Sequence, residues 1–273
     1  MPVEPVRVAG AVVDVAVPAR RGGMAGVRMA GFRGRTESIF DLQMVPYPAL
    51  TLLIDSGDAM LVDAADGEQR RGNVVVGLAP VGVRAGARET DALQIRLSPV
   101  VAHAVLGAAS ELGGAVVTLD RLWGRDAVRL QERLHATTSW DERFAIVHTL
   151  LARRYEAGRR VDPEVAYAWR RIMLSRGGIR VDHLAAETGW TRKRLWSRFR
   201  TQLGITPKRA SQLVRFDRAA HRLAHGHSPA EVSAATGYAD QSHLTRATRS
   251  FTGLTPTALA TAPWLAVDDV AWS

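Results

Sequence analysis

The segment GYADQSHLTRATRSFTGLTP, residues 237–256, contains the start and stop signals of two helices joined by a tight turn. Gly237 is suited to end a helix in the left-handed conformation, and Asp240 is suited to cap the next helix, which we expect to reach about Phe251. Just upstream, Ser228-Pro229-Ala230-Glu231 has the pattern of a capping box with proline at the first helical position. The sequence therefore predicts a helix-turn-helix unit here.

A similar unit lies about 48 residues upstream, because the sequence contains an internal repeat. The GITP at 204–207 corresponds to the GLTP at 253–256, and Gly189 corresponds to Gly237. In the upstream unit Thr191 is the expected cap of a helix that runs to about Gln202. Residues 206–224, between the units, have apolar residues at helical spacing. We therefore expect two helix-turn-helix units held at a fixed separation by one continuous helix.

The second helix of each unit, 191–202 or 240–251, has one apolar face and one polar face. Leu195 and Phe199 share a side of the upstream helix, and Leu244 and Thr248 share a side of the downstream helix. The opposite faces carry side chains that donate hydrogen bonds to base edges in a major groove. A lone basic residue on a helix is usually just solvated, but here both units expose equivalent positions. We therefore predict that DNA is bound by Thr191, Arg192, Lys193, Trp196, Ser197, Arg200, Gln241, Ser242, His243, Thr245, Arg246 and Arg249.

Residues 180–260 resemble the DNA-binding domain of the arabinose-operon regulator (AraC/XylS) family. The resemblance rests on LAAETGWTRKRLWSRFRTQLGITPK at 184–208, RFDRA at 215–219 and GYADQSHLTRATRSFTGLTP. It covers under a third of the chain, and the last motif is specific to the family. The resemblance implies a sequence-specific transcription regulator whose two recognition helices enter successive major grooves, ~34 Å apart.

The resemblance also bears on single residues. It places the base-reading positions on Lys193, Trp196, Ser197 and Arg200 and on Gln241, Ser242, His243 and Arg246, and it implies a structural role for Arg215. The family usually has phenylalanine where Thr248 stands, so we expect looser packing in the second unit, with Phe251 as a partial substitute. Trp196 occupies a usually polar position, where it is expected to contact a thymine methyl group or a sugar.

The positive charge of the chain is concentrated in the same region. Of 36 Lys and Arg residues, 14 lie between residues 176 and 260, together with 5 of the 27 Asp and Glu residues. This segment therefore has a net charge of +9, which equals the net charge of the whole chain, and the remainder is neutral. A basic block within an apolar-rich, patterned segment is typical of a domain that binds a polyanion.

The region before this domain has a different pattern. Residues 5–97 contain short Val-rich and Leu-rich runs separated by Gly, Pro and Asp, which favour antiparallel strands in a sandwich or small barrel. Leu93, Ile95 and Leu97 alternate with polar residues, as in a half-buried strand. Helical spacing follows at about 99–109, 125–136, 140–155 and 163–174. The predicted fold class is α+β, with a β-rich, cupin-like sandwich or barrel domain and helices, followed by an all-α double helix-turn-helix domain.

We divide the chain into four segments. They are a β-rich sensing or oligomerisation domain at 1–124, a helical connector at 125–175, the double helix-turn-helix domain at 176–262, and a C-terminal tail at 263–273. The family resemblance implies that the front domain binds an effector, dimerises or both. The expected partners are double-stranded promoter or operator DNA and RNA polymerase, with a small-molecule effector and a second copy of the chain as candidates.

Enzymatic chemistry has little support in the residues. The chain has no cysteine, which excludes disulfides, thiolate metal sites and Cys nucleophiles. The patterns GxSxG, GxxxxGK[ST] and a GxGxxG after a strand are absent. A metal-dependent cupin needs clustered ligands, but His103 is the single histidine before residue 124 and is expected on a helix surface or in the core. We therefore expect no catalytic residues, metal or cofactor.

Two alternatives stay open. In one, a small-molecule-binding or catalytic cupin-like front domain carries the main activity and DNA binding is secondary. In the other, the protein binds nucleic acid without sequence preference through its charge alone. No segment has the basic start and unbroken apolar stretch of a signal peptide or the length of a membrane span. We expect a cytoplasmic protein without a membrane partner.

Overall fold

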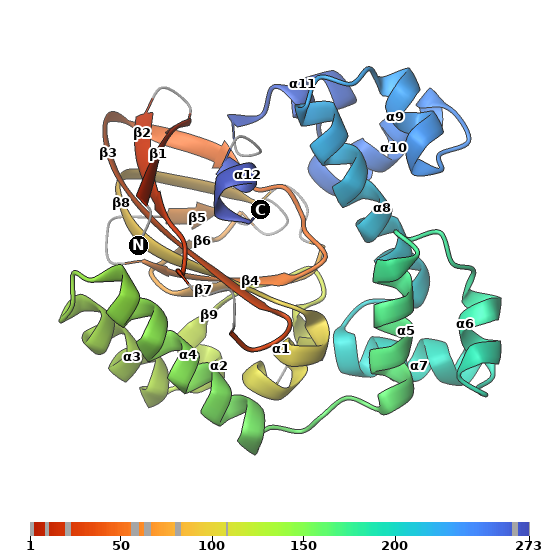
Figure 1. Ribbon diagram of the computed structural model, residues 1–273, viewed down its shortest axis with the longest axis horizontal. Coiled ribbons are helices and arrows are strands. Elements are labelled where there is room, and N and C mark those ends of the chain that lie inside the picture. The colour runs from red at the N-terminus through yellow and green to blue at the C-terminus, as the bar shows by residue number, and fades with distance from the viewer. Residues whose placement is uncertain are drawn as a thin grey trace.

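The computed structural model describes residues 3–8, 11–19, 23–55, 60–62, 67–79, 83–107, 109–263 and 267–272. A β-rich front domain lies beside a group of helices from the C-terminal part of the chain (Figure 1). The predicted fold class, β-rich first and all-α afterwards, is confirmed. None of the described helices is long and apolar enough to cross a membrane.

The front domain is built on one antiparallel sheet. Its main path has the order β1-β2-β3-β8-β4-β7-β9, and β5 pairs with both β6 and β8. The long central pair β3 and β8 changes register between Arg35 and Phe40. The strands are β1 Val3–Val8, β2 Ala11–Ala16, β3 Val27–Gln43, β4 Leu50–Asp55, β5 Met60–Val62, β6 Gln69–Arg71, β7 Val74–Val76, β8 Arg84–Leu97 and β9 Val116–Thr118.

Strand β8 is more deeply buried than its alternating pattern predicts. Leu93, Ile95 and Leu97 are buried as expected, but Gln94 and Arg96 on the opposite face are buried as well. The half-buried interpretation of this strand was therefore wrong. Arg96 is covered because the rings of Tyr47 and Trp272 lie against its guanidinium group, at 3.5 and 4.0 Å.

Several helices complete the front half. They are α1 Pro99–Leu106, the 3-10 helix η1 Ala109–Leu112, α2 Leu119–Trp123, α3 Arg125–His135 and α4 Trp140–Ala157. Helix α4 docks on the sheet through Trp140, whose ring occupies the space that a Cβ at Gly31 would need. Arg33 and Arg143 flank that ring at 5.0 and 4.9 Å, and both guanidinium groups pair with Asp91.

The remaining helices form the C-terminal group. They are α5 Pro163–Leu174, α6 Val181–Glu187, α7 Arg192–Leu203, α8 Pro207–Ala224, α9 Pro229–Thr236, α10 Gln241–Thr252 and α11 Pro256–Ala260. Helix α8 is the central element, and α5, α9, α10 and α11 all pack against it. Its predicted apolar face is buried, including Leu213, Phe216 and Leu223. The prediction of one continuous helix between the two units is confirmed.

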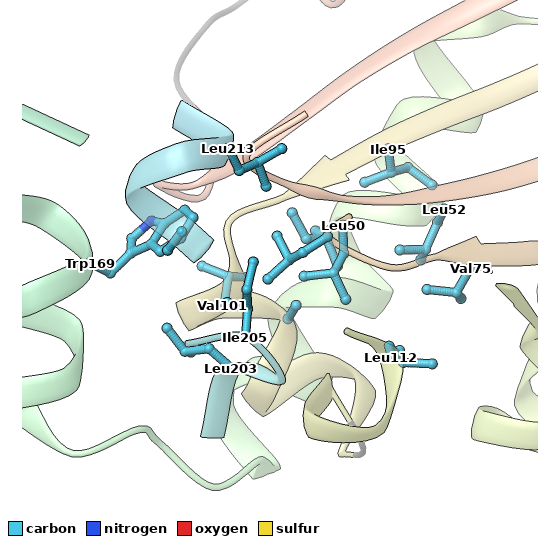
Figure 2. Close-up of a cluster of buried hydrophobic side chains, with 14 of the residues drawn as sticks. Leu50, Leu52, Val75, Ile95, Val101, Leu112, Trp169, Leu203, Ile205 and Leu213 are labelled. Atoms are coloured by element: carbon cyan, nitrogen blue, oxygen red, sulfur yellow. The ribbon is translucent and has the colours of Figure 1, made fainter. Parts of the chain in front are cut away.

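The two halves share one hydrophobic core. Figure 2 shows Leu203 of α7 and Ile205 of the turn after it beside Val101 of α1, with Leu50 of the sheet and Trp169 of α5 in the same cluster. His103 of α1 also forms a hydrogen bond of 2.9 Å through Nδ1 with the carbonyl of Gln202 at the end of α7. The front domain is therefore packed directly against the first helix-turn-helix unit.

The chain finally returns to the front domain. Beyond α11, the short helix α12, Asp268–Ala271, lies against the sheet (Figure 1). Ala271 and Trp272 join a small buried cluster with Val8, Val13 and Val15 of strands β1 and β2. The C-terminal tail is thus part of the front domain's packing.

Candidate nucleic-acid interface

The first helix-turn-helix unit follows its local sequence signals. Helix α6 ends with Gly189 in the left-handed conformation, at φ 68°, and the amide of Trp190 donates to the carbonyl of Ala185 at 3.0 Å. The hydroxyl of Thr191 accepts a hydrogen bond of 3.2 Å from the Arg194 amide and caps α7. These bonds give hydrogen-bond partners to backbone groups at the ends of α6 and α7 that have none within their own helix. They also fix the direction in which α7 leaves the turn.

The second unit has the same construction with stronger capping. Ser228 and Glu231 form a complete capping box at the start of α9, and the hydrogen bond from the Ser228 amide lowers the pKa of the Glu231 carboxyl. Gly237, at φ 76°, ends α9. The carboxylate of Asp240 then accepts the amide of His243 at 2.6 Å and caps α10. The predicted caps are confirmed at each of these positions.

The inner faces of the two recognition helices anchor them. Leu195 and Phe199 of α7 and Leu244 of α10 are fully buried. Thr248 is also fully buried, and its hydroxyl donates to the Leu244 carbonyl at 2.9 Å, so its polar group has a partner. Phe251 supplies the aromatic ring in this unit and stacks on Phe216 of α8, with ring centroids 4.8 Å apart.

The outer faces carry the predicted DNA-binding residues. All those on the first unit are exposed, as are Gln241, Ser242, Arg246 and Arg249 on the second, whereas His243 and Thr245 are half-buried. Trp196 is the largest apolar side chain on these faces and is 45% exposed. The Arg200 guanidinium lies 5.2 Å from its ring. The structure therefore places the predicted residues on two surfaces, one on α7 and one on α10.

Some of these side chains already have partners within the protein. Arg192 forms an ion pair of 3.0 Å with Asp182, and the Thr245 hydroxyl donates to the Gln241 carbonyl. The Nδ1 atom of His243 accepts the Ala239 amide, so the neutral ring carries its proton on Nε2. Lys193 and Arg246 form no ion pair with any residue that the structure describes, and they are free to meet a phosphate or a base edge.

Other basic residues of α7 hold the domain together. Arg198 pairs with Asp162, just before α5, at 2.7 Å, and Arg194 covers the ring of Trp190 at 4.5 Å. Arg215 of α8 donates hydrogen bonds to the carbonyls of Gly177 and Gly237 at 3.0 and 3.3 Å. Gly177 lies before α6 of the first unit, and Gly237 lies between α9 and α10 of the second. These hydrogen bonds agree with the structural role that the family resemblance implies for Arg215.

Sequence reasoning missed a basic groove between α10 and the start of α6. The groove has a volume of about 770 Å³ and also borders α8. Asp182 is the acidic residue in its described lining, and the basic residues there outnumber it. In the sequence, the groove is signalled by the local excess of positive charge alone. Its lining residues come from three separate helices, so no single motif contains them. The basic lining residues are Arg180, Lys208, Arg209, Arg215 and Arg246.

Within the part of the chain that the structure describes, no group of three or more His, Asp or Glu side chains is placed to hold a metal ion. The main candidate site is formed by the polar and basic surfaces of α7 and α10, because both expose side chains that suit DNA contacts.

Comparisons with known proteins agree with this geometry. A family model described as a helix-turn-helix domain matches residues 184–262. The uncharacterized HTH-type transcriptional regulator YbfI of Bacillus subtilis (strain 168) is 35% identical over 66 residues. That match spans 24% of this chain and 24% of YbfI, so it covers about a quarter of the relative's length.

Two solved structures give more distant likenesses. ToxT from Vibrio cholerae O395 is 10% identical, with a TM-score of 0.47, over 89% of this chain and 99% of that one. The AraC-like transcriptional activator CuxR is 16% identical, with a TM-score of 0.33, over 71% and 82%. The family model and the paired helices agree on one part of the chain: residues 184–262 are a helix-turn-helix domain.

Proposed function

We propose that the protein is a sequence-specific DNA-binding transcription regulator that reads two successive major-groove segments, one with α7 and one with α10. The observation that carries this proposal is the repeated arrangement of the two helices. Each has a buried apolar face and an exposed polar, basic face, and α8 joins them without a break. The helix-turn-helix domain that the family model matches at residues 184–262 supports the same function.

The proposed DNA contacts divide into two kinds. In the first DNA segment, Lys193 and Arg200 suit contacts with phosphate or guanine. In the second segment, Gln241 suits a contact with adenine and Arg246 suits a contact with guanine. Trp196 suits a thymine methyl group or a sugar. The full set of proposed contacts is Thr191, Arg192, Lys193, Trp196, Ser197, Arg200, Gln241, Ser242, His243, Thr245, Arg246 and Arg249.

The front domain, in this proposal, modulates DNA binding through an effector or a second copy of the chain. The proposed segments are 1–124, 125–175, 176–262 and 263–273; within the connector at 125–175, α4 packs on α1 of the front domain and α5 packs on α8. We propose RNA polymerase as the protein partner, a location in the cytoplasm with the DNA, and no enzymatic activity.

The test is selection of bound sequences from random duplex DNA, with wild type beside Arg246→Ala. We expect a motif with two blocks about 10 base pairs apart, with one block blurred by the variant. A lost bidentate contact should cost about 1–3 kcal/mol at that position. Arg133→Ala, on the exposed surface of α3, is the matched control for net charge. Recovery of no motif, with salt-sensitive binding unchanged by Arg246→Ala, would overturn the proposal.

A further inference from the structure

A buried carboxylate lies where the front domain, α8 and α12 meet. The Asp268 side chain is 4% exposed. Its Oδ1 atom accepts hydrogen bonds from the Tyr47 hydroxyl at 2.8 Å and from the Arg96 guanidinium at 2.9 Å. Its Oδ2 atom lies 2.9 Å from Nε2 of His221. Three donors from distant parts of the sequence therefore converge on one carboxylate.

The three donors are held in place by groups other than Asp268. The Tyr47 ring lies 3.5 Å from the Arg96 guanidinium. Nδ1 of His221 lies 2.8 Å from the Asp217 carbonyl, an acceptor, while Nε2 faces the carboxylate. Because both ring nitrogens face acceptors, the ring is an imidazolium. Two cations and a phenol thus form a preorganised anion site, with Asp217 as the nearby second acid.

Asp268 does not accept a hydrogen bond from every donor in the site. Arg96 uses one terminal nitrogen for Asp268, and its Nε atom is buried without an acceptor among the described residues. Such a buried donor costs free energy until an acceptor reaches it. Removing the Asp268 carboxylate would leave two cations, Arg96 and His221, with Asp217 as the one nearby acid, and the excess positive charge favours entry of another anion.

We propose that Tyr47, Arg96 and His221 form a carboxylate-binding site between the front domain and α8, and that the chain's own Asp268 occupies it as a tethered ligand. The class of external ligand is a carboxylic acid, since the occupant is a planar, two-oxygen anion enclosed on all sides. A phosphate would bring further oxygens into a space that leaves Asp268 4% exposed.

The site also connects the two halves of the protein. His221 belongs to α8, which holds the two recognition helices, whereas Tyr47 and Arg96 belong to the front domain. Tethering gives Asp268 a high effective concentration, so a free acid must bind tightly to replace it. The regulatory meaning of this exchange rests on the proposed function, but the existence of the site does not.

Chemical rescue of the full-length protein tests the site without any DNA. Replacing Asp268 with alanine should empty it and lower the Tm by roughly 5–15 °C. Sodium acetate or formate should restore most of that loss, and sodium chloride at equal ionic strength should not. Asp269→Ala is the matched control on the same helix, because Asp269 is 63% exposed and pairs with His225 at the surface.

A second variant separates shape from charge. Asp268→Asn keeps the volume of the side chain, so acetate should give no rescue although the protein is destabilised. The proposal is overturned if Asp268→Ala behaves like Asp269→Ala, or if acetate and chloride act equally on it. If Asp268→Ala aggregates, its soluble yield on refolding should rise with acetate and not with chloride, and equal yields would overturn the proposal too.

Discussion

A Cβ atom at residue 113 would overlap with the carbonyl oxygen of Gly204. Gly113 follows η1 in the front domain, and Gly204 is the left-handed residue that ends α7. The backbone of the front domain therefore touches the end of the first recognition helix with no side chain between them. Movement of either segment toward the other must therefore displace it.

Gly113→Ala should destabilise the protein by about 1–3 kcal/mol, because the new methyl group overlaps with backbone that cannot rotate away. Urea unfolding measures the change in free energy. The matched control is Gly114→Ala, whose Cβ would meet only the Ala79 carbonyl at an ordinary 3.6 Å. Equal stability of the two variants would show that the close approach to Gly204 carries no cost.

Ser228→Ala should lower the free energy of unfolding by about 0.5–2 kcal/mol, since it removes the side-chain acceptor for the Glu231 amide at the start of α9. Thermal unfolding checks the value. Glu231→Gln keeps an oxygen that can accept the Ser228 amide, so we expect a smaller loss for it. A Glu231→Gln loss as large as that of Ser228→Ala would contradict the capping-box account.

Lys193→Ala should weaken DNA binding about uniformly across sequences and reduce the salt slope of the binding constant by about 1, as expected for one lost phosphate contact. Titrations at several salt concentrations measure the slope. Arg198→Ala is the control, because this residue of the same helix is paired with Asp162. A larger slope change for Arg198→Ala than for Lys193→Ala would refute the assignment of the outer face.

The stability of the protein should fall as the pH rises from about 6.5 to about 9. The hydrogen bond to Asp268 raises the pKa of His221 to about 9, and the nearby Asp217 carboxyl adds to the rise. A histidine with a raised folded-state pKa stabilises fully below its unfolded value, about 6.5, and this contribution is lost as the pH passes the folded value. The loss should be about 1–3 kcal/mol, because His221 is partly exposed to solvent.

Urea unfolding at pH 6.5 and pH 9 measures this loss, and His221→Gln should remove most of it. His225→Gln, which alters an exposed histidine on the same helix turn, should keep the wild-type dependence. Burial raises the pKa of Asp217 to about 6, so its protonated form stabilises the protein fully below about pH 4, and this contribution is lost as the pH rises to about 6, below the window from pH 6.5 to pH 9. An unchanged alkaline loss in His221→Gln would rule out His221 as its source.

The local parts of this structure could be predicted from the sequence. Ser228 with Glu231, Gly237 and Asp240 specify their turns through neighbours within four residues, and the structure has those bonds. The apolar stripe of α8 likewise follows from helical spacing. These elements depend on backbone geometry that nearby residues determine, so a single sequence is enough to predict them.

The contacts between the two halves could not be predicted. Tyr47, Arg96, His221 and Asp268 are separated by up to 221 positions, and nothing in their spacing indicates that they meet. The burial of Arg96 was missed for this reason, because an arginine in an alternating strand normally faces water. The identity of the arginines that pair internally, such as Arg198, depends on the same distant packing.

The unbroken helix α8 has a consequence for the DNA side of the interaction. Its 18 residues span about 27 Å, and the helix has no joint at which the two reading units could turn relative to each other. Deleting one base pair between the two blocks rotates one block by about 34° around the duplex, which the protein cannot follow. The DNA sites of the proposed regulator should therefore tolerate substitutions within each block far better than a change in the distance between them.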